Sequence, residues 1–172
     1  RCNEILKRLS LNPNEEDDFI DENFTIRDIL KEIVSSFEET SKKKFILNFD
    51  QDLNSKKMTR SIEIAYGLRN FIGNANKFSN KKIFINLKSN IETTEIKIQD
   101  DGAGYPNDIL SKIGEPYLKS FYNKSKTGLG LGIFIGKNLL EKNFASINCR
   151  NSRTRGGAEV IIKWNNKNLY KL

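Results

Sequence analysis

A glycine-rich run, Gly128-Leu129-Gly130-Leu131-Gly132, stands directly before a segment with helical periodicity. Glycine has no Cβ atom, so a backbone with alternating glycines can turn sharply and approach a ligand closely. The first turn of a helix leaves amide N–H groups without intrahelical partners and carries the positive end of the helix dipole. The run therefore predicts a site for an anion such as a polyphosphate, although glycine pairs also begin helices for packing reasons alone.

A second group with chemical potential is Asn70, Asn74 and Lys77. Their spacing of i, i+4 and i+7 places them on one face of a helix. Amide oxygens are hard ligands that suit Mg²⁺ beside phosphate oxygens and water, and a lysine offers a point charge to phosphate. The alternative is an ordinary solvated face, and two asparagines by themselves favour that alternative.

A third group, Asp100, Gly102 and Gly104, follows an apolar strand pattern. An aspartate at a strand end can accept a hydrogen bond from an exocyclic amine, and the two glycines allow the ligand to approach. The alternative is a simple turn, because Asp-Gly is a common turn dipeptide.

Composition narrows the chemistry further. The chain has 172 residues and no histidine, which excludes Ser-His and Cys-His catalysis within it. Any phosphohistidine chemistry must then use a residue outside this chain. The net charge of +7 is spread over scattered lysines, so we expect no nucleic-acid partner. Two cysteines far apart in sequence define neither a disulfide framework nor a zinc site.

The hydrophobic pattern predicts an α+β sandwich in which helices pack on one face of a mixed sheet. Thr25 is the expected N-cap of a helix whose apolar face runs from Ile26 to Phe37, with Asp28 completing a capping box. The other expected elements are strands at 45–49, 83–87, 96–98, 147–149 and 160–164, helices at about 59–78 and 128–142, and a long connection at 101–127 with a short helix near 108–113.

The order of the motifs resembles the GHKL ATP-binding fold, and specifically the catalytic domain of sensor histidine kinases. Residues 68–79 look like the N box of that family, 100–104 its G1 box, 126–133 its G2 box and 155–158 a loose version of its last glycine motif. The resemblance covers about residues 25–164. It implies a Bergerat-type two-layer sandwich with a long ATP lid, and ATP and Mg²⁺ as cofactors.

The resemblance also implies a role for each matching residue. Asn74 would hold Mg²⁺, and Lys77 would approach the phosphates. Asp100 would accept a hydrogen bond from the adenine amine, and Gly102 and Gly104 would let the ligand approach. Tyr117 stands where relatives have an aromatic residue that docks the lid. The expected phosphate-binding residues of the G2 box are Lys126, Thr127, Gly128, Leu129, Gly130 and Leu131, and the unranked candidates for closing over the γ-phosphate are Lys119, Lys124 and Lys126.

Asn70 separates two kinds of GHKL protein. Relatives that hydrolyse ATP have a glutamate there to activate water, and an asparagine cannot act as that base. The expected reaction is therefore in-line transfer of the γ-phosphoryl group to a histidine of a dimerisation domain. Because the chain has no histidine, we expect it to be a catalytic fragment, largely monomeric, of a homodimeric kinase that passes phosphate to a response regulator.

Residues 1–6, 108–117 and 128–141 are similar to the redox-responding RegB/PrrB kinases of proteobacteria. The similarity implies a redox-sensitive cysteine at Cys2 and a membrane sensor upstream, with this domain in the cytoplasm. The alternative for Cys2 is a half-exposed helix cysteine. Cys149 alternates in step with Ile147 and is expected to be a small core residue.

The expected domain boundaries follow from the same resemblance. Residues 1–11 would end the second helix of the dimerisation domain, 12–24 form an acidic linker, 25–166 form the ATP-binding catalytic domain, and 167–172 are a C-terminal tail. Two other functions stay open on the sequence alone: a GHKL serine kinase of the anti-sigma-factor type, and a degenerate nucleotide-binding module that signals through its lid.

Overall fold

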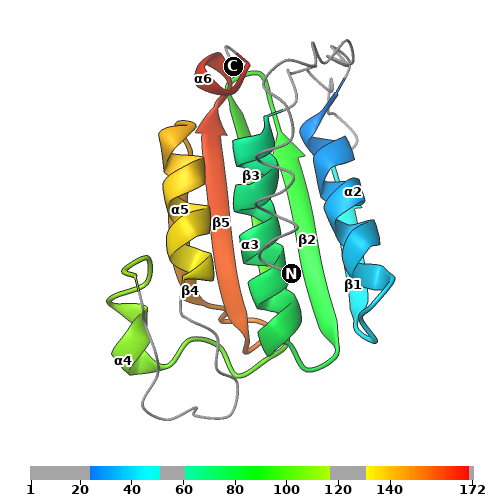
Figure 1. Cartoon of the computed structure of the whole chain (residues 1–172), viewed down its shortest axis with the longest axis vertical. Coiled ribbons are helices and arrows are strands. Elements are labelled where there is room, and N and C mark those ends of the chain that lie inside the picture. Colours follow the sequence, from blue (N-terminus) through cyan, green and yellow to red (C-terminus); the bar gives the residue numbers. More distant parts are fainter. Residues whose placement is uncertain (1–23, 51–60, 117–130, 171–172) are drawn as a thin grey trace, which may run out of the picture.

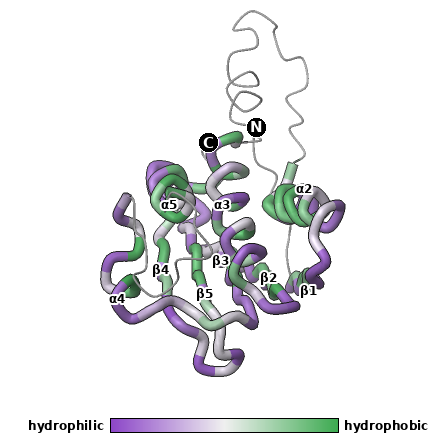
Figure 2. The backbone as a smooth tube through the Cα atoms, turned by 60° about the horizontal axis from the view of Figure 1, so that its bottom comes forward, coloured by the Kyte–Doolittle hydropathy of each residue, from purple (hydrophilic) through white to green (hydrophobic). Residues whose placement is uncertain are grey.

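The computed structural model describes residues 24–50, 61–116 and 131–170. These residues form a five-stranded sheet with the main helices on one face (Figure 1). Viewed along the layers, α2, α3 and α5 lie together above the strands (Figure 2). The expected α+β sandwich with helices on one face of a mixed sheet is confirmed.

Helix α2 (Ile26–Glu38) begins where the capping pattern predicts. The Thr25 hydroxyl accepts a hydrogen bond from the Asp28 N–H at 3.2 Å, and the Asp28 carboxylate accepts from the Thr25 N–H at 3.0 Å. This reciprocal pair satisfies two N–H groups that a helix start otherwise leaves without partners. The apolar face of the helix then buries Ile29 and Leu30 completely against the sheet.

The sheet has the strand order β1-β2-β3-β5-β4. β1 runs parallel to β2, and every other neighbouring pair is antiparallel, so the sheet is mixed. The strands are β1 (Lys44–Phe49), β2 (Lys82–Ser89), β3 (Thr93–Asp100), β4 (Ser146–Asn151) and β5 (Ala158–Asn165).

Alternate residues of the strands face the helices and build the core, because strand side chains point to opposite faces in turn. The core residues of β2 and β3 are those that the sequence pattern predicts: Ile83, Ile85, Leu87, Ile96 and Ile98, each at most 2% exposed. Trp164 of β5 is also buried, and its indole N–H donates to the carbonyl of Asn143 at 3.1 Å.

Helix α3 (Ile62–Phe78) lies across the middle of the sheet. We expected it to begin at about residue 59, and this start was wrong by three residues. The Ser61 hydroxyl accepts a hydrogen bond from the Ile64 N–H at 3.2 Å, so Ser61 is the N-cap. A serine N-cap fixes the start of a helix because its hydroxyl accepts a hydrogen bond from an N–H group that has no partner within the helix.

The remaining helices are α4 (Asn107–Leu110), α5 (Gly132–Lys142) and α6 (Asn166–Leu169). α4 is shorter than the helix expected near 108–113: it ends at Leu110, and the chain continues in turns that include Gly114, which has a φ of +97°. The expected start of the α5 segment at residue 128 lies outside the described residues. α6 buries Leu169 completely and so extends the packed core past residue 166. No helix in the described ranges is both long and apolar enough to cross a membrane.

Candidate functional site

Three chain segments that carry predicted site residues meet at one end of the sandwich. β3 ends at Asp100, α3 ends at Phe78, and α5 begins at Gly132, all at the lower end of the molecule in Figure 1. The end of a helix and the start of another therefore flank the end of a central strand. Residues as far apart in the sequence as Phe78 and Gly132 share this end of the fold.

Asp100 is the buried polar group at the centre of this end and is 3% exposed. Its Oδ1 accepts hydrogen bonds from the N–H groups of Gly102, at 2.8 Å, and Ala158, at 3.2 Å. No donor within the described ranges reaches Oδ2. Burial raises the pKa of the Asp100 carboxyl, although the two N–H donors act in the opposite direction. Asp100 thus offers one acceptor oxygen for a ligand, held in place by the bonds to the other.

The glycines on either side of Asp100 allow the backbone to come this close. A Cβ atom on Gly157 would lie 2.1 Å from the Asp100 carbonyl oxygen, and one on Gly102 would lie 2.3 Å from the Phe78 carbonyl oxygen. Real Cβ atoms do not approach oxygen so closely, so neither position can hold a side chain without moving the backbone. At Gly102 the chain that leaves β3 lies against the end of α3. At Gly157 the chain that enters β5 lies against the end of β3.

Asp101, the neighbour of Asp100, has a different role that the sequence analysis did not identify. Its carboxylate accepts hydrogen bonds from the N–H groups of Asn80, Lys81 and Lys82 at 2.8–3.1 Å. Burial opposes ionisation, but these backbone donors outweigh it and lower the pKa of Asp101. Asp101 therefore ties the turn after β3 to the loop that follows α3.

Gly104 is the second glycine predicted for this site, and it has a φ of +78°, which favours glycine. The Asn151 amide fixes the backbone of the next residue from both sides. Its Oδ1 accepts from the Tyr105 N–H at 2.6 Å, and its Nδ2 donates to the Tyr105 carbonyl at 3.0 Å. The end of β4 thus holds the chain that leaves the aspartate. A lone asparagine at a strand end carries no sequence signal for this contact.

Small residues bring α3 and α5 close together. A Cβ atom on Gly67 would lie 2.6 Å from the Leu140 side chain, and one on Gly136 would lie 3.1 Å from the Asn70 Cβ. Asn70 lies at this contact, and its Nδ2 donates to the Tyr66 carbonyl at 2.9 Å. Its Oδ1 lies 3.7 Å from the position of a Cβ on Gly132. Asn70 therefore faces the first turn of α5.

Asn74 and Lys77 lie one and two turns further along α3. Asn74 is half-buried, and none of the described residues forms a hydrogen bond with its side-chain amide. The Lys77 ammonium lies 5.3 Å from the centre of the Phe78 ring. Both side chains thus keep polar atoms available for a ligand. Lys43 of the loop before β1 completes this end of the helix by donating to the carbonyls of Asn76 and Ser79.

The donor set fits a magnesium ion held together with a phosphate ligand. Mg²⁺ is commonly bound through one or two protein oxygens while phosphate and water supply the rest. Asn74 offers such an oxygen, since nothing in the described structure occupies its amide. In the described ranges no group of three or more acidic, cysteine or histidine side chains forms a metal cage. A site that depends on substrate phosphate fits these residues better than a closed protein site.

Several predicted site residues lie outside the described ranges. They are Cys2, Tyr117, Lys119, Lys124, Lys126, Thr127, Gly128, Leu129 and Gly130. Leu131 is described: it precedes α5, and its carbonyl accepts the first helical hydrogen bond from the Ile135 N–H at 2.8 Å. The glycine-rich run thus ends where the helix N–H groups without intrahelical partners begin.

Cys149 of β4 is partly buried against the core, close to its expected role as a small core residue. Burial raises the pKa of its thiol to about 11, and the hydrogen bond with Tyr105 offsets only part of that rise. A thiol with so high a pKa carries little of the reactive thiolate at neutral pH.

Comparison with known proteins identifies the family of this domain. The family model for histidine kinase-, DNA gyrase B-, and HSP90-like ATPases matches residues 59–168. The chain is 33% identical over 122 residues to the sensor histidine kinase RegB of Cereibacter sphaeroides, a match that covers 61% of this chain and 26% of the relative. The chain thus spans about a quarter of the length of that relative.

Solved structures show the same fold. The mycobacterial sensor histidine kinase MprB has a TM-score of 0.68 and 17% identity, with 83% of this chain and 95% of that chain covered. Full-length ShkA in complex with AMPPNP has a TM-score of 0.68 and 18% identity, with 83% of this chain and 30% of that chain covered. The chain belongs to the histidine kinase-, DNA gyrase B-, and HSP90-like ATPase family. Its fold is that of the catalytic domains of histidine kinases.

Proposed function

We propose that this domain binds ATP with Mg²⁺ and transfers the γ-phosphoryl group to a histidine on a dimerisation domain of the same kinase. The observation that carries the proposal is the buried Asp100 carboxylate. It keeps one oxygen available among glycines, at the end of the fold where the α3 amides and the start of α5 converge. The complex of ShkA with AMPPNP, an analogue of ATP, supports a nucleotide as the ligand of this fold.

The proposed assignments follow the geometry. Asp100 accepts a hydrogen bond from the adenine amine, which supplies base selectivity because the carboxylate has no donor to offer. The first turn of α5, after Leu131, faces the phosphates with its free N–H groups. Asn74 and Lys77 of α3 hold the charged end of the ligand. Bound Mg²⁺ would neutralise charge on the phosphate oxygens.

Transfer rather than hydrolysis is the proposed reaction because Asn70 cannot take a proton from water. The bond between the γ-phosphorus and the bridging oxygen breaks, a bond from an imidazole nitrogen to phosphorus forms, and ADP leaves. The imidazole belongs to another domain, since this chain has no histidine. Catalysis then rests on positioning and charge neutralisation.

The similarity to RegB supports a finer proposal. The parent protein is a homodimeric membrane sensor that responds to redox state, with this domain in the cytoplasm and Cys2 as the candidate sensing thiol. A response regulator receives the phosphate. The isolated chain is a monomer in this proposal, because the dimer contacts would belong to the dimerisation domain.

The first test is calorimetric titration of the chain with AMPPNP, with and without Mg²⁺. We expect binding that strengthens with the metal. The second test adds a separately prepared dimerisation domain and radiolabelled ATP, and we expect label on histidine of the added domain. Binding without any transfer would favour the degenerate module, and label on serine would favour the serine kinase.

Asn74→Ala tests the proposed metal-binding residue. We expect it to abolish phosphotransfer and the effect of Mg²⁺ on binding while the domain stays folded, since no described hydrogen bond is lost. Asn76→Ala is the matched control on the same helix. It removes a hydrogen bond from the Ser41 hydroxyl at 2.8 Å, so it costs stability but leaves transfer intact. Full activity of Asn74→Ala would remove Asn74 from the mechanism.

A further inference from the structure

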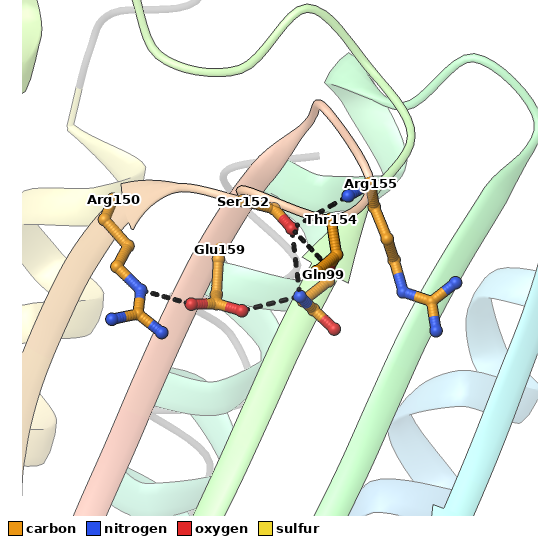
Figure 3. Close-up of polar contacts among 6 residues, drawn as sticks. All are labelled: Gln99, Arg150, Ser152, Thr154, Arg155 and Glu159. Carbon is orange, nitrogen blue, oxygen red and sulfur yellow. Dashed lines mark hydrogen bonds and ion pairs between the residues drawn. The ribbon is translucent and has the colours of Figure 1, made fainter.

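A buried carboxylate outside the site described so far is Glu159, the second residue of β5. It is 4% exposed and lies on the face of the sheet opposite the helices (Figure 3). Its Oε2 accepts a hydrogen bond from Gln99 Nε2 at 2.5 Å, and its Oε1 accepts from Arg150 Nε. The three residues sit side by side on β3, β5 and β4. A buried carboxylate is costly even when paired, so stability alone does not explain this one.

Gln99, Glu159 and Arg150 lie directly beside the proposed nucleotide site. The backbone pairing of β3 with β5 ends at Gln99 and Glu159. The next residues along the two strands are Asp100 and Ala158, which are joined by the hydrogen bond from the Ala158 N–H to Asp100 Oδ1 at 3.2 Å. The side-chain hydrogen bond between Gln99 and Glu159 therefore links the last paired residues of the two strands, directly next to Asp100.

Ser152 extends the network into the loop between β4 and β5. Its hydroxyl accepts from Gln99 Nε2 at 3.2 Å and from the Arg155 N–H at 3.2 Å, and its own N–H donates to the Gly157 carbonyl at 2.8 Å. Figure 3 shows the contacts among Gln99, Glu159, Arg150 and Ser152 as one connected group that spans three strands. The network thus holds the loop that presses Gly157 against Asp100.

We propose that Glu159 is a positioning residue for base recognition. By bridging Gln99 and Arg150 it fixes the Ala158 N–H and Gly157 against one oxygen of Asp100, and so aims the other oxygen at the adenine amine. The inference rests on the proposed function in one respect, namely that Asp100 receives the adenine amine. The positioning of Asp100 by Glu159 is a property of the ligand-free domain and is testable without nucleotide.

The variant that tests the proposal is Glu159→Ala, with Glu95→Ala as the matched control on β3. The Arg150 side chain is 56% exposed and returns to water when its partner is removed, so the variant is expected to fold. Glu95 points to the same face of the sheet, four residues before Gln99, and is opposite Lys163. Glu159→Gln is a second variant that keeps the shape and can still accept one of the two hydrogen bonds.

The first readout is amide hydrogen exchange of the ligand-free protein by NMR. We expect Glu159→Ala to speed exchange of the Ala158 amide about 10-fold relative to the Ile162 amide of the same strand, the effect of one lost hydrogen bond. Glu159→Gln should fall between this variant and the wild type, and Glu95→Ala should leave the ratio unchanged. An unchanged ratio in Glu159→Ala would overturn the proposal.

The second readout is base selectivity. The affinity for an ATP analogue should fall about 10-fold in Glu159→Ala, while the affinity for purine riboside triphosphate, which lacks the 6-amino group, should not change. Equal losses for both nucleotides would show a merely structural role and contradict the inference. If the wild type bound neither nucleotide, the proposed function would fail, and the exchange at Ala158 would still decide whether Glu159 positions Asp100.

Discussion

Replacing Asp100 with asparagine tests the proposed adenine contact with the smallest change in shape. The carboxylate has two acceptor oxygens: Oδ1 accepts from the Gly102 and Ala158 N–H groups, and Oδ2 has no donor in the described part of the chain. An asparagine has only one oxygen. If that oxygen keeps the two backbone bonds, an NH₂ group faces the adenine amine, and donor meets donor.

The expected loss follows from this geometry. A hydrogen bond to a charged acceptor contributes about 1.5–3 kcal/mol, which corresponds to a loss of about 10- to 150-fold in affinity. The free domain should keep its stability or gain some, because burial already disfavours the charged form of Asp100 and the amide is neutral. Weaker binding by this variant therefore cannot be attributed to unfolding.

Calorimetry with an ATP analogue and with purine riboside triphosphate checks the prediction as a double-mutant cycle. The wild type should prefer ATP, and Asp100→Asn should lose most of that preference. Two results would contradict the proposed adenine contact: a variant that binds ATP as tightly as the wild type, or one that loses affinity equally for both nucleotides.

The pH dependence of binding provides a second check on Asp100. Burial raises the pKa of this carboxyl in the free domain, and the adenine amine favours the charged form, so protonation opposes binding. We expect the preference for ATP to be full at neutral pH and to be lost as the pH falls through the raised pKa. The loss should begin at a higher pH than for an aspartate with the ordinary pKa of 3.8. A preference for ATP that stays constant down to a pH of about 3.8 would contradict the assignment of Asp100 to the adenine amine.

Three further predictions concern packing and reactivity. Gly157→Ala should abolish nucleotide binding, because its Cβ would lie 2.1 Å from the backbone oxygen of Asp100. The control is Gly156→Ala, where a Cβ meets no atom but the φ is +80°; it should cost only about 1–2 kcal/mol of stability and leave the affinity for nucleotide intact. In a variant without Cys2, Cys149 should react with iodoacetamide at neutral pH about 100-fold more slowly than an ordinary thiol, since its pKa is about 11 instead of 9.0, and a rate typical of a free thiol would contradict this. Gly67→Ala should lower the free energy of unfolding by about 1–3 kcal/mol in urea titrations through overpacking against α5, despite the better helix propensity of alanine.

Local patterns account for the part of the fold that the sequence predicted correctly. The capping box at Thr25 and the alternation of Ile83 with Ile85 depend on neighbours a few residues away, and the structure confirms both. The same holds for the placement of Asp100 at a strand end just before two glycines. The start of α3 was wrong because several residues in the segment suit a helix start, and only the hydrogen bond at Ser61 selects one of them.

The class of the domain could be predicted from the amino-acid sequence alone, because the motifs stand in a fixed order and each depends on its own residues. The missing histidine likewise showed, without any structure, that the histidine of the proposed transfer would have to lie outside this chain. The groups that surround Asp100, by contrast, became known only from the packing of the folded domain. Asp101 turns away from it to hold residues 80–82, and Asn151 and Glu159 reach its surroundings from two other strands. These contacts join residues 19 to 60 positions apart, and local sequence carries no signal for which side chains the packing of strands will bring together.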